Sequence, residues 1–267
     1  SVYHGFSTSV QRRFNNGFTG NFSYTWSHLI DDSTAEVFST VLSPRRAQDF
    51  QNIRAERADS ALDSRHRFVA SGIYDLPLFS KSQNRLVKSL LGGFSFAATA
   101  TFESGKRATP LSGIDSNLNG DAAGDRTIVN VNGVKGTSSL VTPLRNSGGQ
   151  IVGYLANNPN AEYIQAGLGA LATGGRNTLQ LPGIQNLDFS VFKNFAITET
   201  MKMQFRADFF NAFNNPQYVP GSVNGVNPIN TTAVGNVNTV GRRDFNRPER
   251  VFSSNPRVIQ LALRLNF

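Results

Sequence analysis

The stretch that decides the fold is the last one in the chain, Arg257-Val-Ile-Gln-Leu-Ala-Leu-Arg-Leu-Asn-Phe267. From Ile259 onward an apolar side chain stands at every second position, and this period of two predicts a strand with one apolar face. The row includes the terminal residue, Phe267. Chain ends of soluble domains tend to be exposed and poorly ordered. A terminal aromatic in an apolar row therefore favours a strand whose apolar face meets lipid.

Six further segments alternate in the same way. The clearest is Phe18–Trp26, where aromatic residues and one glycine alternate with Asn, Ser and Thr. The others are Tyr3–Phe14, His66–Leu76, Phe94–Phe102, Leu187–Phe195 and Met203–Phe209. No stretch longer than a turn predicts a helix, although a short helix within 37–61 is an alternative. The sequence therefore predicts an all-β fold with seven strands.

The connections between these strands alternate between short and long. The short ones are 14–17, 77–93 and 196–202, and the long ones are 27–65, 103–186 and 210–256. The long ones are rich in Gly, Asn, Ser and Pro, as in 219–238, and predict irregular structure. Structureless loops of this length are uncommon in compact domains. They are typical of an antiparallel transmembrane β-barrel, with long extracellular loops and short periplasmic turns.

Composition excludes several classes of protein. The 267 residues contain no Cys, which excludes a disulfide scaffold, a thiolate zinc site and a Cys nucleophile. The three histidines are far apart and no catalytic spacing is present, so we expect no enzymatic activity. The 26 basic and 18 acidic residues give a net charge of +8, but the basic residues are dispersed, and we expect no nucleic-acid partner. A soluble β-sandwich remains an alternative, although its outer faces are often charged, and the polar faces here are mostly uncharged.

Several short motifs follow one another in an order and spacing typical of one family. They are Gly20–Ser27, Asp63–Gly72, Gly175–Asn177, Asn186–Ser190, Lys193–Phe195, Gln204–Asn214 and Arg257–Phe267. With them the chain resembles the C-terminal part of TonB-dependent outer-membrane receptors, in particular the Oar-like group that carries a carboxypeptidase-regulatory-like domain. No single motif is highly specific, but the ordered set is.

The resemblance implies a location in the bacterial outer membrane. It makes residues 1–267 the C-terminal part of a 22-strand barrel whose plug, TonB box and signal peptide lie upstream. Seven strands alone should then form an open sheet with two free edges, or recruit an eighth strand from a long loop. The implied function is TonB-dependent uptake of a scarce ligand: a siderophore, glycan, peptide or cobalamin. Alternatives are a passive porin or structural outer-membrane protein, and a soluble β-sandwich adhesin or carbohydrate-binding module.

The resemblance also implies partners. These are outer-membrane lipid, the TonB complex acting through the plug, and the barrel-assembly machinery. The assembly signal would be the C-terminal apolar row, Ile259, Leu261, Leu263, Leu265 and Phe267. Arg242, Arg243, Arg247 and Arg250 cluster in the last long loop, where they could pair with lipopolysaccharide phosphates or simply be solvated.

The polar positions of the strands predict a water-filled or plug-contacting face. By parity this face includes Asn21, Ser23, Thr25, Gln204, Arg206, Asp208, Gln260 and Arg264. A charged residue at the lipid midplane would cost about 2–4 kcal/mol, so Arg206 and Arg264 should point into the lumen. Either could form an ion pair with Asp208 that sets the register; contact with the plug is the alternative.

One loop contains the start of a calcium-binding pattern. Asp115, Asn117, Asn119 and Asp121 place oxygen side chains at positions 1, 3, 5 and 7, with glycine at position 6. The glutamate expected at position 12 is replaced by Arg126, and Asp125 stands one residue early. The alternative is an ordinary polar turn. No other cofactor is expected.

Overall fold

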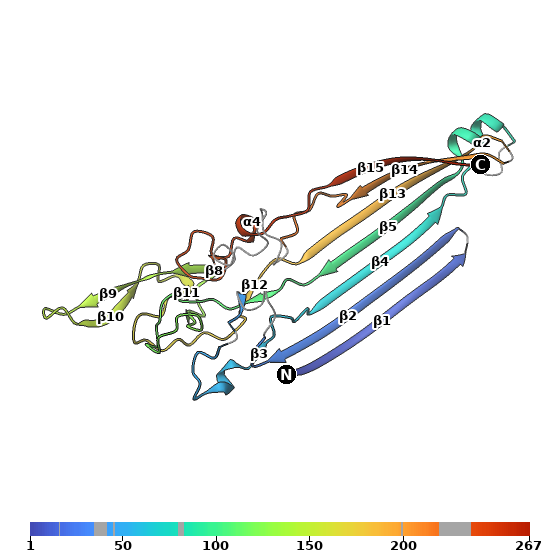
Figure 1. Ribbon diagram of the computed structural model, residues 1–267. Coiled ribbons are helices and arrows are strands. Elements are labelled where there is room, and N and C mark those ends of the chain that lie inside the picture. The colour runs from blue at the N-terminus through green and yellow to red at the C-terminus, as the bar shows by residue number, and fades with distance from the viewer. Residues whose placement is uncertain (16, 35–41, 45, 80–82, 199, 219–235) are drawn as a thin grey trace.

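A single open antiparallel sheet dominates the structure, a computed structural model (Figure 1). The structure describes residues 1–15, 17–34, 42–44, 46–79, 83–198, 200–218 and 236–267. The main strands are β1 (Val2–Asn15), β2 (Phe18–Asp31), β4 (His66–Asp75), β5 (Phe94–Glu103), β13 (Ile184–Ala196), β14 (Lys202–Phe210) and β15 (Val258–Asn266). Each pairs with the next in this order. All seven predicted strands are therefore confirmed, most of them extended by a few residues.

The sheet does not close into a barrel. Within the described residues β1 pairs with β2 alone and β15 with β14 alone, so the sheet has two free edges. An eighth, short strand, β3 (Ala58–Asp59), comes from the first long connection and pairs with the end of β2. The predicted open sheet is thus confirmed, and the short strand from the long connection leaves both of its edges free.

Short and long connections lie at opposite ends of the sheet (Figure 1). At the turn end, Gly17 takes a left-handed backbone conformation with φ of 79°, as the predicted hairpin requires; Asn16 lies outside the described residues. The 77–93 connection contains helix α2 (Arg85–Leu91), so the expectation of no helix there was wrong. The Asn84 side chain caps α2 by accepting from the amides of Leu86 and Val87.

The apolar face of the sheet is uncovered. Cross-strand register places the aromatic and aliphatic rows of all the strands on one face. Many of these side chains are exposed, including Phe22, Phe205 and Leu263. A sandwich would bury this face against a second sheet, and the described residues contain no such sheet. No described helix is long and apolar enough to cross a membrane.

The three long connections fold together at the other end, into a unit that we call the cap. It contains η1 (Ile53–Glu56), α4 (Pro248–Val251) and the short strands β6 (Arg107–Ala108), β7 (Ile128–Val129), β8 (Val134–Ser139), β9 (Val141–Arg145), β10 (Ile151–Ala156), β11 (Ala161–Ile164) and β12 (Leu179–Gln180). Within 37–61 the described residues contain the single turn η1, and Leu42 is helical as well. The expectation of irregular loops was wrong where these short strands and helices form and was confirmed for most other described residues of the connections; 37–41 and most of 219–238 lie outside the described residues.

The hydrophobic core of the protein lies in the cap and not against the sheet. Its buried members come from all three long connections: Leu42, Ala108, Tyr163, Leu179, Leu181, Val237, Val240, Phe245, Val251 and Phe252. Tyr163 packs edge-on against Phe245 with ring centroids 6.0 Å apart. Because these residues are far apart in sequence and follow no regular period, the core could not be recognised from local patterns.

Candidate functional site

The polar face of the sheet gathers the residues predicted to face the lumen. Asn21 on β2 lies beside Ser71 on β4, and the row continues through Thr99 on β5 to Asp188 on β13. A parallel row joins Ser190 on β13 to residues on β14 and β15. The predicted residues all share this face: Asn21, Ser23, Thr25, Gln204, Arg206, Asp208, Gln260 and Arg264.

One of the two predicted ion pairs on this face is present. Arg206 Nε lies 2.7 Å from Asp208 Oδ1. Arg264 is opposite Gln204 in the register, four pairs away from the pair of Asp208 and Gln260. The Arg206–Asp208 pair runs along one strand and therefore does not set the register, contrary to expectation. The cross-strand link is the Ser190 hydroxyl, which donates to Asp208 Oδ1 at 2.5 Å.

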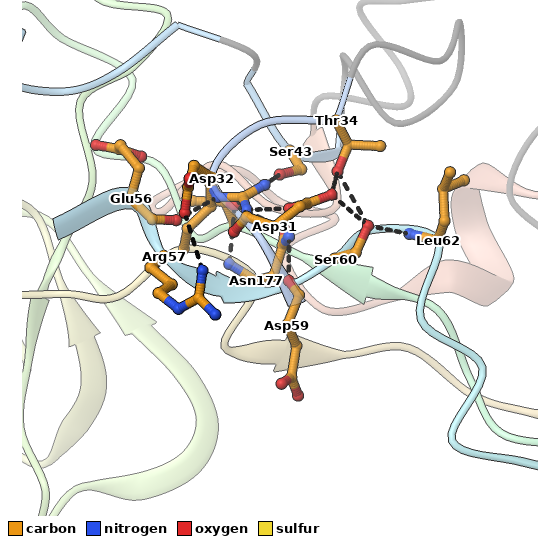
Figure 2. Close-up of polar contacts among 12 residues, drawn as sticks. Asp31, Asp32, Thr34, Ser43, Glu56, Arg57, Asp59, Ser60, Leu62 and Asn177 are labelled. Carbon is orange, nitrogen blue, oxygen red and sulfur yellow. Dashed lines mark hydrogen bonds and ion pairs between the residues drawn. The ribbon is translucent and has the colours of Figure 1, made fainter. Parts of the chain in front are cut away.

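A buried network joins the cap to the end of β2. Figure 2 shows the Asp31 carboxylate, which accepts from the hydroxyls of Thr34 at 2.7 Å and Ser60 at 2.5 Å. The guanidinium of Arg176 pairs with the same carboxylate and donates to the carbonyl of Glu56 at 2.9 Å. The Arg176 side chain is 1% exposed. This one cation therefore ties the 104–183 connection to the 32–65 connection and to the sheet.

A second buried ion pair lies next to the first. Arg126 Nη1 is 2.9 Å from Glu56 Oε2, with the two side chains 6% and 4% exposed. Arg126 also donates to the side-chain oxygen of Gln48. Burial lowers the pKa of Arg126, and the charge of Glu56 opposes that effect. Local sequence patterns did not point to this network; Gly175–Asn177, one of the stretches behind the family resemblance, was the available signal for Arg176.

Asp59, on the recruited strand β3, is surrounded by three basic side chains at the rim of the sheet. It contacts Arg65 and Arg107 at 3.1 Å each and the imidazole of His28 at 2.8 Å. Asp63 accepts from the amide of Leu29 at 2.7 Å. These contacts hold the first long connection against the ends of β2 and β4.

The Asp115–Asp121 loop is ordered by its own side chains. The two carboxylate oxygens of Asp115 accept from the amides of Asn119 at 3.0 Å and Gly120 at 2.8 Å. Asn119 Oδ1 accepts from the amide of Asp121 at 2.8 Å, and Asn117 Oδ1 accepts from that of Asn119. Within the described part of the chain, no three His, Asp or Glu side chains form a ready-made metal cluster.

Asp125 lies beneath this loop. Its Oδ2 accepts from the amides of Ser116 at 2.5 Å and Asn117 at 3.4 Å. The residue is 1% exposed. Burial raises the pKa of Asp125, and the charges of Asp115 and Asp121 raise it further.

An open pocket lies on the polar face where β13, β14 and β15 meet the cap. Its lining includes Asn186, Asp188, Asn211, Gln217 and Asn255. Asn211 donates to the carbonyl of Asn255 at 2.8 Å, and its own amide donates to Asp188 Oδ1 at 2.9 Å. The sequence prediction missed Asn211 and Gln217 because they follow β14, outside the alternating pattern.

Comparison with known protein families identifies the family of the chain. The model of the outer membrane beta barrel domain matches residues 1–260. The chain belongs to this outer-membrane β-barrel family. Neither the comparison with curated proteins nor that with solved structures gave a match.

Membership of the outer-membrane β-barrel family places the protein in the bacterial outer membrane. It also explains why the apolar face is exposed, since strands of this family carry apolar residues toward lipid and polar ones inward. The soluble β-sandwich alternative is thereby overturned. The predicted C-terminal assembly residues Ile259, Leu261, Leu263 and Leu265 lie on this apolar face, and Phe267 follows directly after β15.

Proposed function

We propose that this chain is the wall and the extracellular mouth of a TonB-dependent outer-membrane receptor, which takes up a scarce ligand through a gated pore. In outer-membrane barrels the turns are periplasmic and the long loops extracellular, so the cap faces the outside. The polar face then lines the lumen, where Arg206 and Asp208 meet water or a plug. The chain performs no covalent chemistry in this function.

The observation that carries the proposal is the folded cap. Three long connections share one hydrophobic core and two buried ion pairs, Arg176–Asp31 and Arg126–Glu56. Binding costs less free energy when the binding loops are ordered beforehand. A preformed cap at the mouth of a barrel therefore supports selective capture of a ligand.

The pocket beside the cap supports the same proposal. Amide side chains and the carboxylate of Asp188 line it, together with the apolar side chains of Phe210, Pro256 and Val258. The polar groups suit a ligand rich in hydrogen-bonding atoms, as siderophores, glycans, peptides and cobalamin all are. A ligand leaving this pocket along the polar face would meet the row from Asp188 to Asn21.

The proposed partners follow from the same orientation. Lipid covers the apolar face, the TonB complex acts through an upstream plug, and the barrel-assembly machinery binds β15. Arg242, Arg243, Arg247 and Arg250 are exposed on the cap, where lipopolysaccharide phosphates are the anions expected at the outer leaflet.

Single-channel conductance tests the proposal against the passive porin. The complete protein, purified in detergent, is inserted into planar lipid bilayers. A receptor whose lumen holds a plug should show no stable open channel, because the plug occupies the polar lumen. Steady, ligand-independent conductance would overturn the proposal and assign a porin.

The gene sequence upstream of Ser1 provides an independent test. A plug domain and a TonB box are expected there. A signal peptide directly before Tyr3 would contradict the receptor assignment.

A further inference from the structure

We propose that the loop from Asp115 to Asp125 binds a single calcium ion that locks the cap. The site would use the side-chain oxygens of Asp115, Asn117 and Asn119, the carbonyl of Asp121, and the carboxylate of Asp125. This inference is independent of whether the barrel is a gated receptor or an open pore.

The deciding observation is an oxygen atom without a partner. Within the described residues, Oδ1 of Asp125 is buried and accepts no hydrogen bond. A buried, unpaired carboxylate oxygen is costly, and such groups are normally paired or bound to a metal. The other oxygen of the same carboxylate accepts from the amides of Ser116 and Asn117. The carboxylate therefore lies against the backbone of the 115–121 loop, and its unpaired oxygen is the atom that the proposed ion would satisfy.

Among the described residues, no basic side chain forms an ion pair with Asp125. Arg126 is bound to Glu56 and Arg46 to Asp121. Asp115 and Asp121 add negative charge nearby. The loop therefore has an excess of negative charge around a buried oxygen, which a divalent cation would balance.

The donor set and spacing favour calcium. Ca²⁺ takes six to eight oxygen ligands, and in the best-known loops these come from positions 1, 3 and 5, from the backbone carbonyl of position 7, and from a carboxylate near position 12. Because position 7 contributes its carbonyl, the Arg46–Asp121 pair can remain intact. Asp125, at position 11, supplies the closing carboxylate in place of the missing glutamate.

The contacts of the loop with other parts of the cap indicate how a bound ion would stabilise the cap. Ser116 donates through its hydroxyl to the carbonyl of Ala166 at 2.7 Å, and Asn117 donates to the carbonyl of Gln48 at 2.8 Å. The amide of Gly169 donates to the carbonyl of Ser116. Ordering this loop would thus fasten the first long connection to the second.

Calorimetry tests the site. The complete detergent-purified protein, stripped with a chelator, is titrated with CaCl₂ and separately with MgCl₂. We expect one Ca²⁺ per chain, with a dissociation constant on the order of 10⁻⁴ to 10⁻³ M or tighter, and weaker Mg²⁺ binding because Mg²⁺ dehydrates reluctantly. If the protein takes up no Ca²⁺, the proposal is overturned; this is the result expected if Asp125 stays protonated.

Variants separate this site from calcium held by anionic lipid. Asp125→Asn should weaken binding by at least about tenfold, because it removes the closing carboxylate. The matched control, Asp32→Asn, changes an exposed aspartate outside the loop and its contacts and should bind like the wild type. Equal affinity in Asp125→Asn and wild type would overturn the proposal.

A second variant and a second measurement cover the case in which Asp125→Asn fails to fold. Asp115→Asn keeps the side-chain shape and removes the charge at position 1, so we again expect weaker binding. In the wild type, Ca²⁺ should slow proteolysis within 104–183, whereas in Asp115→Asn it should not. If Ca²⁺ protects both proteins equally from proteolysis, the proposed site is wrong.

Discussion

The guanidinium of Arg176 donates to both the carboxylate and the backbone carbonyl of Asp31, although 145 positions separate the two residues in the chain. Asp31 is the last residue of β2 and Arg176 belongs to the cap. Both side chains are buried, at 9% and 1% exposed. The contact therefore fixes where the cap sits on the sheet, and with it the mouth of the barrel.

Removing this cation should loosen the cap. Arg176→Met leaves the buried carboxylate of Asp31 without its partner, which costs about 3–5 kcal/mol. The loss of unfolding free energy is measured by urea titration, with the protease resistance of residues 104–183 as the readout at each urea concentration. The control is Arg242→Met at an exposed position. Combining Arg176→Met with Asp31→Asn should recover part of the stability; a double variant whose losses simply add would argue against a direct coupling.

Gly105 is expected to accept no side chain. A Cβ there would overlap the carbonyl of Leu181, where the second long connection leaves β5 and returns toward β13. Gly105→Ala should therefore destabilise the junction by about 1–3 kcal/mol or more. Gly153→Ala on β10 is the matched control, since nothing lies within 4 Å of its Cβ. Thermal unfolding of the two variants measures the difference, and equal melting temperatures would contradict the prediction.

Lys193 should hold helix α2 against the apolar face at the turn end. Its ammonium donates to the carbonyls of Ser89, at 2.7 Å, and Gly92, and it lies 4.7 Å from the ring centroids of Phe94 and Phe195. Lys193→Met should lower the local opening free energy of α2 by about 1.5–3 kcal/mol, the usual value for charged hydrogen bonds.

Amide hydrogen exchange of residues 85–91 measures the effect of Lys193→Met. The exposed Lys202→Met, on the neighbouring strand, serves as the control and should leave the exchange unchanged. Unaltered exchange in Lys193→Met would show that α2 is held by other contacts.

Tyr163 should make the cap sensitive to alkaline pH. It is 3% exposed, and burial raises the pKa of its hydroxyl. A pKa raised in the folded state gives stability that is complete below the unfolded value of about 10 and is lost as the pH rises through the folded value. Above about pH 10 the wild type should therefore lose stability faster than Tyr163→Phe.

The comparison uses the unfolding free energy between about pH 8 and pH 11. Near neutrality Tyr163→Phe should be the less stable of the two by about 0.5–1.5 kcal/mol, because it lacks the hydrogen bond with Thr178. Tyr3→Phe, at an exposed position on β1, should follow the wild type. Parallel curves for wild type and Tyr163→Phe would refute the assignment.

Much of the sheet could be predicted because its signal is local. In Phe18–Trp26 the alternation of aromatic and small polar residues predicts both the strand and its two faces. The register of β2 with β4 keeps those faces aligned. The same parity placed Arg206 and Asp208 on the polar face. It could not decide between Arg206 and Arg264 as the partner of Asp208, because that choice depends on which residues the register brings together.

The sequence by itself determined the strands, their order, the two faces and the alternation of short turns with long connections. Each of these depends on a period of two or on spacing along the chain. Tertiary structure alone decided that the long connections form one cap. Arg176 meets Asp31, and Leu42 packs with Phe252, only after the sheet has brought the ends of β2, β5 and β14 together. Contacts between residues so far apart leave no periodic trace, because burial there depends on neighbours in space and not on neighbours in sequence.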